Sequence, residues 1–503
     1  MNYFFPIGVA LLAIASSIAM AAPQPDFGSL AGLIQKTKEH TAHPSGTAIA
    51  VLKDGKVVYE GYFGFSDISA QTQVTGDTVF YIASATKPFF ALNALLKEEA
   101  GQLDRRTSLQ QMFPDIHFSG IHAKAVTIEN LLGHTSGIDN QPLVWATAFS
   151  GVHDARSRRA LVAASYPNAE IKLGSFMYTN VGYNILSVWL DTELAMPWQD
   201  QLDRAIFEPL KMARTTAYIS KAQVQDWPLA KPYSFASLNP SEPLYLRKAD
   251  STLHAAGGLV STAPDLAKFL LVQLGAGKYK SSRIFPKSVV RNSHISQAKF
   301  DASYLDFKRT GYAWGWYSGD YKGKSMRHAF GAFPGFHAHL SFMPTENIGL
   351  VVLNNEDAIG ARMTNLIADY VYGILLEEPG IDAKVSQRFS ELKVSAKEMQ
   401  RALAKHRAEI QGRPSSLSQP LEAYVGVYTS ELLGTMTIEL DKNTALLIRF
   451  GNLAAVATGY AKTDYVRVEF SPNSGDFLSF ALKDGRVDSL AFNHATFKKA
   501  QSR

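Results

Sequence analysis

Residues 80–96 of the chain read Phe80-Tyr-Ile-Ala-Ser84-Ala-Thr-Lys87-Pro88-Phe-Phe-Ala-Leu-Asn-Ala-Leu-Leu96. A short apolar approach ends at Ser84, and the apolar residues that follow recur at the spacing of a buried helix. Pro88 is tolerated only in a first helical turn, where its missing N–H leaves no helical bond unmade. We therefore expect the helix to begin at Ser84, with this serine as its cap and Lys87 on the same side of the helix end.

This arrangement suits a nucleophilic serine. The lysine can accept the hydroxyl proton, and the helix N-terminus stabilises the negative charge that develops on attack. The Ser-x-x-Lys spacing alone is weak evidence, because it also occurs at Ser296 and Ser390, and a capping serine with a solvated lysine gives the same pattern. Ser84 differs from the other two because it alone lies between a strand-like approach and a buried helix.

Two further stretches accompany the Ser84–Lys87 pair. Residues 99–104 read Glu-Ala-Gly-Gln-Leu-Asp, and residues 128–137 read Ile-Glu-Asn-Leu-Leu-Gly-His-Thr-Ser-Gly. In this order the three stretches closely resemble the serine beta-lactamase-related family, which includes class C beta-lactamases, D-Ala-D-Ala peptidases, D-aminopeptidases and esterases. The resemblance spans roughly residues 25 to 380. It implies an α/β (α+β) fold of the beta-lactamase/transpeptidase type, with an antiparallel sheet flanked by helices and an all-helical region. For His134 we prefer a structural role in a turn that ends a helix.

Tyr178 and Asn180 form the second chemical element, in Tyr178-Thr-Asn-Val-Gly-Tyr-Asn184. Two residues apart in an extended loop, they project to the same side. They resemble the family's Tyr-x-Asn motif, whereas Tyr166-Pro-Asn168 lacks the Gly-Tyr-Asn that follows. A half-buried structural tyrosine is the alternative for Tyr178, which we would favour if Ser84 were absent.

Neither a free phenol nor a free lysine is a useful base at neutral pH. The Lys87 ammonium favours a Tyr178 phenolate, and burial favours a neutral lysine, so one proton can be shared between them. Which of the two deprotonates Ser84 stays open at this point. Asn180 can accept a hydrogen bond from Lys87 and donate one to a substrate carbonyl.

The third element, Arg327-His328-Ala-Phe-Gly331-Ala332-Phe-Pro-Gly335, resembles the family's Lys/His-x-Gly strand, with its register off by one. Gly331 matches the motif glycine, but Ala329 stands where the family has lysine or histidine. His328 reaches a substrate only if a β-bulge turns it inward, and otherwise we expect a surface histidine. The resemblance implies an oxyanion hole formed by the backbone N–H groups of Ser84 and Ala332.

Other segments predict the surrounding elements. Residues 46–59 alternate around Asp54-Gly55, which indicates a hairpin. Thr262, with Asp265 three residues later, predicts the cap of a helix that extends through Leu274, with Pro264 in its first turn. Gly257-Gly258 is similar to a glycine pair of the same family, and we expect it to have only a structural role.

Composition narrows the class of protein. With 503 residues, 46% hydrophobic and 19% charged, the chain is long enough for one large domain and a smaller one. The net charge is only +5 and no basic block occurs, so nucleic-acid binding has little support. Zero cysteines exclude disulfides, and the 13 histidines do not cluster with carboxylates at metal spacing, so we expect neither a metal nor a cofactor.

The N-terminus predicts export. Residues 4–20 are mostly apolar and lead into Ala19-Met-Ala-Ala22, which is typical of a secretory cleavage site, so we expect a signal peptide at residues 1–21. The start lacks Lys and Arg, and an uncleaved membrane anchor is the alternative. Periplasmic or secreted localisation follows, with membrane or cell-wall proximity.

The C-terminal quarter differs from the rest. Residues 22–380 form the predicted hydrolase domain, 381–418 a polar helical segment and linker, and 419–503 a small all-β domain of short alternating runs. Leu421-Glu-Ala-Tyr-Val-Gly-Val-Tyr428 looks like the start of the lipocalin-like domain often appended to these hydrolases. We expect it to pack against the hydrolase domain or gate its substrate.

These observations predict a serine hydrolase that acts through an acyl-enzyme on small molecules or peptides. Ser84 attacks, Lys87 and Tyr178 move protons, and Asn180 orients. Without a lysine on the third motif's strand, esters, amides or peptides are favoured over beta-lactams. The alternative is a penicillin-binding-protein-like binder of cell-wall peptides that does not turn them over.

Overall fold

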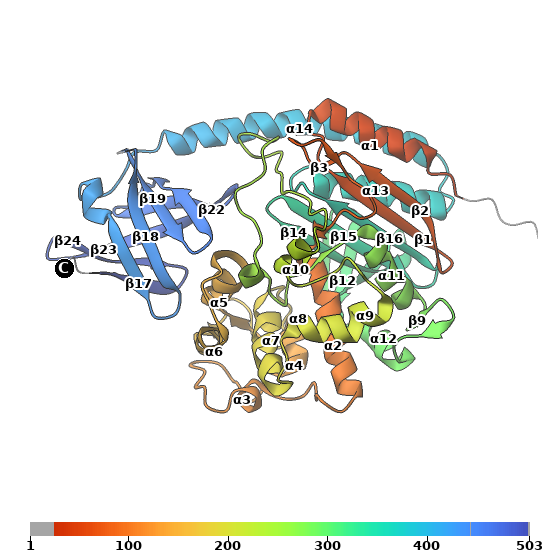
Figure 1. Ribbon diagram of the computed structural model, residues 1–503, viewed down its shortest axis with the longest axis horizontal. Coiled ribbons are helices and arrows are strands. Elements are labelled where there is room, and N and C mark those ends of the chain that lie inside the picture. Colours follow the sequence, from red (N-terminus) through yellow and green to blue (C-terminus); the bar gives the residue numbers. More distant parts are fainter. Residues whose placement is uncertain (1–24, 443, 501–503) are drawn as a thin grey trace, which may run out of the picture.

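The computed structural model describes residues 25–442 and 444–500 (Figure 1). A large sheet with helices on both faces adjoins a helical region, and the long helix α14 leads to an all-β C-terminal part. The predicted signal peptide at residues 1–21 lies outside the described residues. Within the described part of the chain, no helix is long and apolar enough to cross a membrane.

The large sheet has eight antiparallel strands in the order β11-β12-β13-β14-β15-β16-β1-β2. The predicted hairpin at Asp54-Gly55 is confirmed, since both residues have positive φ and join paired strands. The strands are β1 Thr47–Lys53, β2 Lys56–Phe63, β11 Ala298–Tyr304, β12 Phe307–Tyr312, β13 Tyr317–Tyr321, β14 Lys324–Phe333, β15 Phe336–Met343 and β16 Ile348–Asn354.

Side chains of the central strands alternate between two hydrophobic cores. Ala48 and Ala50 face the core that contains α2 (Lys87–Glu99) and α11 (Ala263–Leu274). Ile49 and Val51 face the core of α1 (Gly28–Thr41), α13 (Gly360–Leu375) and α14 (Ile381–Gln411). Every residue of β15 and β16 is buried, so helices cover both faces of the sheet there.

The helical region follows α2. As predicted, Thr262 caps α11 by accepting from the Asp265 N–H, and Pro264 lies in its first turn.

The remaining helices are α3 Leu109–Met112, α4 Ile128–Leu132, α5 Gln141–Trp145, α6 Ala155–Ala163, α7 Val181–Glu193, α8 Trp198–Leu202, α9 Glu208–Leu210, α10 Ile219–Val224 and α12 Lys287–Ser293. The π-helical turns are η2 Ala146–Ser150 and η3 Asp203–Phe207, and the 3-10 turns are η1 Ala83–Thr86, η4 Asp250–Thr252 and η5 Leu421–Tyr424. The short paired strands are β3 Phe65–Asp67, β4 Thr72–Gln73, β5 Phe80–Tyr81, β6 Ile138–Asp139, β7 Tyr166–Pro167, β8 Val260–Ser261, β9 Lys278–Tyr279 and β10 Ser282–Arg283.

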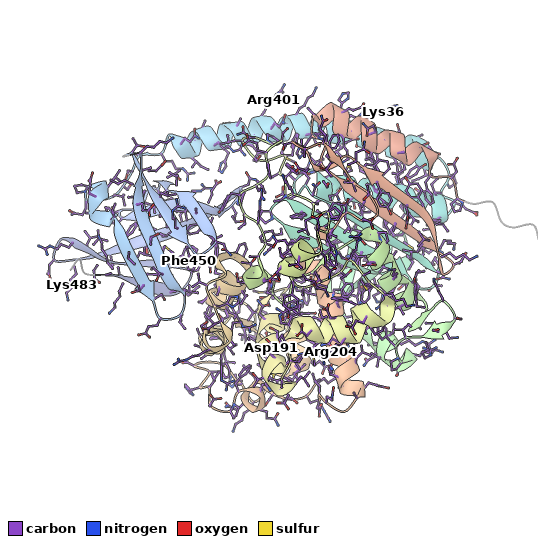
Figure 2. The ribbon with its side chains drawn as sticks, viewed as in Figure 1. Lys36, Asp191, Arg204, Arg401, Phe450 and Lys483 are labelled. Carbon is purple, nitrogen blue, oxygen red and sulfur yellow. The ribbon has the colours of Figure 1, made fainter. Side chains whose placement is uncertain are left out.

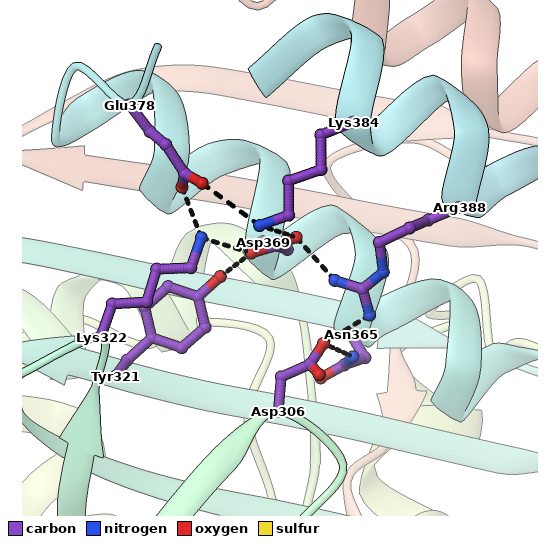
Figure 3. Close-up of polar contacts among 8 residues, drawn as sticks. All are labelled: Asp306, Tyr321, Lys322, Asn365, Asp369, Glu378, Lys384 and Arg388. Carbon is purple, nitrogen blue, oxygen red and sulfur yellow. Dashed lines mark hydrogen bonds and ion pairs between the residues drawn. The ribbon is translucent and has the colours of Figure 1, made fainter. Parts of the chain in front are cut away.

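The polar helical run predicted from residue 381 is the single helix α14, which packs on α1 and α13. Asp369 of α13, with a side chain only 1% exposed, anchors it there by binding Arg388 Nη1 at 2.6 Å and Lys384 Nζ at 3.4 Å. Lys322 completes the ion network with a 2.8 Å bond to the same carboxylate and a second bond to Glu378 (Figure 3). The outer face of this layer is charged and solvated, as shown by Lys36 on α1 and Arg401 on α14 (Figure 2).

The C-terminal part is an antiparallel sheet of nine strands that forms a nearly closed barrel. The predicted short strands are confirmed, and Phe450 is fully buried in the barrel core. The barrel contacts the helical region at α5 and η2: the Asn452 N–H donates to the carbonyl of Ser150 in η2 at 2.9 Å, and Trp145 of α5 packs on Phe492. The strands are β17 Gly426–Ser430, β18 Gly434–Asp441, β19 Ala445–Phe450, β20 Leu453–Val456, β21 Thr458–Gly459, β22 Tyr465–Ser471, β23 Ser474–Lys483, β24 Arg486–Phe492 and β25 Ala495–Lys499.

Candidate active site

Ser84 lies in a 3-10 turn between a strand and a helix. β5 pairs with β8 just before it, and the backbone then turns through Ala83, whose φ is +46°. Positive φ in a residue with a side chain is strained and is tolerated where surrounding structure enforces it. Pro88 lies in the first turn of α2, as predicted, but Ser84 is not the helix cap, because η1 inserts one tighter turn before Lys87. The partly exposed Ser84 hydroxyl is thus left without a capping bond.

Lys87 connects the elements of the site. Its Nζ lies 3.0 Å from Ser84 Oγ, 2.8 Å from Asn180 Oδ1 and 2.8 Å from the Ala256 carbonyl oxygen. The side chain is fully buried, and no carboxylate of the described residues lies within ion-pair distance of it. Burial therefore holds the pKa of Lys87 well below its ordinary value. A neutral amine can accept the proton of the serine hydroxyl beside it.

Tyr178 stands over the same lysine, with its ring centroid 4.7 Å from Lys87 Nζ. Burial raises the pKa of Tyr178 above its ordinary value, while hydrogen bonding to Ser84 works in the opposite direction. Of the two states in which the proton can be shared, burial favours the neutral phenol and neutral amine over phenolate and ammonium. The tyrosine is placed to donate a proton, and the lysine to accept one.

Asn180 immediately precedes α7, and its side-chain Oδ1 accepts a hydrogen bond from Lys87 Nζ. The Gly-Tyr-Asn that follows explains how this loop is fixed. A Cβ on Gly182 would lie 2.2 Å from the Leu131 carbonyl oxygen, so only glycine permits this approach of α7 to α4. Tyr183 donates to the Leu132 carbonyl, and Asn184 Oδ1 lies 3.1 Å from His254 Nδ1. By contrast, Tyr166-Pro-Asn168 lies elsewhere, with Tyr166 stacked 4.6 Å from His494 of the barrel.

His134 has the structural position predicted for it, directly after α4 in a left-handed backbone conformation with φ +58°. Its buried ring lies 4.5 Å from the ring of Tyr178, and its Nδ1 accepts the Thr179 N–H at 3.3 Å. Burial, together with the nearby Lys87, holds the pKa of His134 well below its ordinary value, so it is neutral. This histidine therefore has a packing role, and its ring helps to position the ring of Tyr178.

β14 runs beside the nucleophile. A Cβ on Gly331 would lie 1.9 Å from the Ile82 carbonyl oxygen and 3.1 Å from the Ala85 nitrogen, so glycine is required for the strand to approach η1. Ala332, next along the strand, is exposed at the edge of this contact.

The prediction for His328 was wrong in both of its forms. The register of β14 with β13 and with β15 is regular, so no bulge turns His328 toward Ser84, and the side chain is fully buried rather than on the surface. Its ring stacks on Tyr317 at 5.5 Å, and Tyr317 stacks in turn on Tyr178 at 5.7 Å. Burial, reinforced by Arg309, keeps the pKa of His328 well below its ordinary value, so this histidine is not a cation.

Arg309 of β12 was missed by the sequence interpretation. Its guanidinium lies 3.6 Å from the Tyr317 ring centroid and 4.7 Å from that of Tyr304. In residues 25–442 and 444–500 no carboxylate pairs with it, and its buried Nε has no hydrogen-bond partner. No local signal marks it, because only the pairing of β12 with β13 brings it to Tyr317.

Among the described residues, no group of three His, Cys, Asp or Glu side chains is arranged to hold a metal ion. The polar side chains that the site brings together are Ser84, Lys87, Tyr178 and Asn180. Together they supply a hydroxyl, a base without a counter-charge, a proton donor and an orienting amide.

Comparisons with known proteins agree with this geometry. Residues 31–370 match the family model described as beta-lactamase. The chain is 25% identical over 467 residues to the unguisins hydrolase ungD of Aspergillus violaceofuscus, covering 86% of this chain and 79% of that protein. It is 23% identical over 337 residues to penicillin-binding protein 4* of Bacillus subtilis, covering 62% of this chain and 68% of that protein. Among solved structures, the octameric penicillin-binding protein homologue from Pyrococcus abyssi matches with a TM-score of 0.60 and 21% identity, over 94% of this chain and all of that one.

Proposed function

Because the chain belongs to the beta-lactamase family and has its fold, we propose that it is a serine hydrolase that works through an acyl-enzyme, with Ser84 as the nucleophile. The observation that carries the proposal is the contact of Lys87 Nζ with Ser84 Oγ at 3.0 Å. The lysine is buried without a carboxylate partner in the described part of the chain, and its pKa is well below the ordinary value. A lysine in this state is a base at neutral pH.

Each neighbouring group has a role in the proposed reaction. Ser84 Oγ attacks the substrate carbonyl as Lys87 takes its proton, and the leaving group receives a proton from Tyr178 or from the protonated lysine. Asn180 holds the lysine through its Oδ1 and can turn its amide N–H to the substrate. The backbone N–H groups of Ser84 and Ala332 stabilise the oxyanion, each worth about 10²–10³ in rate. Water then hydrolyses the acyl-enzyme.

Esters, amides and peptides are the substrates that this proposal favours over beta-lactams. The strand beside the nucleophile has Ala329 where relatives carry lysine or histidine, and His328 is buried and held neutral. A substrate whose binding depends on a cation at that position therefore has no partner there. We also propose periplasmic or secreted localisation, on the pattern of residues 1–21.

A fluorophosphonate probe tests the proposal, because it labels serines that are activated as nucleophiles. We expect the purified mature protein to gain one covalent adduct at Ser84, which peptide mass spectrometry locates. Ser84→Ala and Lys87→Met should remain unlabelled while folded. Ser296, with the same spacing to Lys299, is an internal control that should stay unmodified.

The second candidate is a binder of cell-wall peptides that does not turn them over, motivated by the displaced third motif. It predicts a folded protein that does not react with the probe and releases no acid from a nitrophenyl ester. Failure of the wild type to be labelled, with circular dichroism showing native structure, would make this candidate the better one.

A further inference from the structure

A cavity whose lining does not include Ser84 is bordered by residues of β5, β8 and β15. Its volume is about 260 Å³. Its walls are largely apolar and include Tyr81, Val260 and Phe336, while Lys231, Arg247 and Lys248 supply three basic side chains. The cavity thus combines an apolar lining with basic groups, and none of the described residues that line it is acidic.

Two of the three basic side chains have no carboxylate partner among the described residues. Lys231 pairs with Asp67 at 2.5 Å, so its charge is neutralised within the protein. For Arg247 and Lys248, no carboxylate of the described residues comes within 4.0 Å. Two adjacent basic side chains on the lining of one apolar cavity, with no carboxylate partner among the described residues, are the arrangement expected where a ligand supplies the negative charge.

Lys248 is held by neutral groups instead. Its Nζ donates to the Ala148 carbonyl at 2.7 Å and lies 3.7 Å from the Phe333 ring centroid and 5.0 Å from that of Tyr81. These contacts orient the amine without supplying a negative charge. Burial leaves the pKa of Lys248 well below its ordinary value, a cost that an anion in the cavity would offset.

One residue of the lining, Tyr81, connects the cavity to the region of the proposed oxyanion hole. Tyr81 precedes Ser84 by three residues, and Phe333, which is outside the lining, directly follows Ala332. The rings of Tyr81 and Phe333 contact each other at 5.3 Å, and those of Tyr81 and Phe336 at 5.9 Å. A ligand against Tyr81 would therefore touch a side chain that packs on the strand that carries Ala332.

We propose that this cavity binds a carboxylate attached to a short apolar chain, with the carboxylate at Arg247 and Lys248 and the chain against Tyr81 and Phe336. The choice of a carboxylate rests on the proposed function, because hydrolysis of an acyl-enzyme at Ser84 releases a carboxylic acid, and Tyr81 of the lining is three residues from Ser84 in the chain. The same chemistry has two sources: the acid that the enzyme itself releases, or a free carboxylate that enters from solution.

Isothermal titration calorimetry with octanoate tests the site on the full-length Ser84→Ala protein, in which no turnover occurs. We expect saturable binding of octanoate, and much weaker binding of octanol and octylamine. Arg247→Gln should weaken octanoate binding about tenfold, the usual effect of losing one charge-assisted hydrogen bond. Lys248→Met should do the same, and Arg204→Gln, an exposed arginine outside the cavity lining, is the matched control that should leave the affinity unchanged.

The outcomes are decisive in both directions. Octanol binding as tightly as octanoate, or Arg247→Gln without effect, would overturn the proposal, and tighter binding of octyl phosphate would overturn the choice of a carboxylate. Arg247 is exposed, so its variant is expected to fold even if Lys248→Met does not. Competitive inhibition of ester hydrolysis by octanoate would assign the ligand to the released acid, and binding without competition would assign it to a free carboxylate. Because binding is measured without turnover, its failure is distinguishable from a failure of Ser84 to react with the fluorophosphonate.

Discussion

Two polar clusters of this protein, one buried and one partly exposed, use lysine in opposite ways. Lys87 is surrounded by a hydroxyl, an amide oxygen and a backbone carbonyl, and burial lowers its pKa well below the ordinary value. Lys322 is also partly buried, which would lower its pKa, but its bonds to Asp369 and Glu378 raise the value above the ordinary one (Figure 3). The number of carboxylates in contact, two in one cluster and none in the other, thus separates a structural cation from a base.

The largest effect is expected from Lys87→Met. Removing the amine removes the proposed general base, and we expect kcat/KM for a nitrophenyl ester to fall by about 10⁴-fold. Lys322→Met is the matched control, since that lysine belongs to the ion network, and its activity per folded molecule should equal that of the wild type. Equal losses in the two variants would show that the contrast between the clusters has no functional meaning.

Asp369→Asn comes next and acts on stability. It leaves Lys322, Lys384 and Arg388 facing one another without their shared carboxylate, so we expect a loss of about 3 kcal/mol in the free energy of unfolding. The pKa of Asp369 is lowered to about 2, which means that the folded state favours the charged form. Its stabilising contribution is therefore complete above the unfolded-state pKa near 4 and is lost as the pH falls toward about 2.

Thermal melting of the wild type and Asp369→Asn at pH 7 and pH 2.5 checks this sign. The difference in melting temperature should be large at pH 7 and small at pH 2.5, while turnover per folded molecule is unchanged. A difference that grows on acidification would contradict the role assigned to the carboxylate.

Asn180→Asp makes the surroundings of Lys87 resemble those of Lys322, because it adds a carboxylate. It places a carboxylate where the amide oxygen lies, 2.8 Å from Lys87 Nζ, and so raises the pKa of the lysine. The rate depends on the neutral amine, so it rises with pH as the lysine loses its proton. We expect kcat/KM at pH 7 to fall about 30-fold and the ascending limb of the pH profile to move to higher pH, which recovers part of the loss in alkali.

A pH–rate profile of kcat/KM from pH 5 to 10 makes this comparison. Asn180→Ala serves as the control, because it removes the orienting amide without adding charge and should lower the rate with no such movement of the limb. If the ascending limb of the pH–rate profile does not move in Asn180→Asp, Lys87 does not titrate in the reaction.

The parts of this contrast that follow from local spacing were predictable from the sequence. Ser84 and Lys87 are three residues apart, Asp54-Gly55 sets a hairpin, and Thr262 caps a helix, so each can be inferred from neighbours in the chain. The insertion of η1 was not predictable, because it depends on β5 pairing with β8, about 180 residues away. The capping role assigned to Ser84 failed for this reason.

The charged surroundings of the site depend on strand pairing and were the least predictable part. His328 is buried because β14 pairs regularly on both sides, and those partner strands cannot be recognised from the residues around His328 in the sequence. Arg309 and Lys248 contact aromatic rings from other strands, so nothing in their own neighbourhoods of sequence marks them. Among the described residues no carboxylate lies within 4.0 Å of Lys87 Nζ, which decides the chemistry of this lysine, and this too is a property of the folded chain.

Arg309 offers the smallest test, as a cation held by aromatic rings rather than by carboxylates. Burial lowers its pKa, yet a guanidinium stays charged where a lysine in the same place would lose its proton. We expect Arg309→Lys to cost about 1 kcal/mol of stability through the lost stacking on Tyr317, with kcat/KM within about threefold of the wild type. Thermal melting and ester hydrolysis measure the two effects. A loss of activity approaching that of Lys87→Met would instead place Arg309 in contact with the substrate. Of the two buried basic groups without a carboxylate partner in the described residues, Arg309 would then bind the substrate and Lys87 would act as the base.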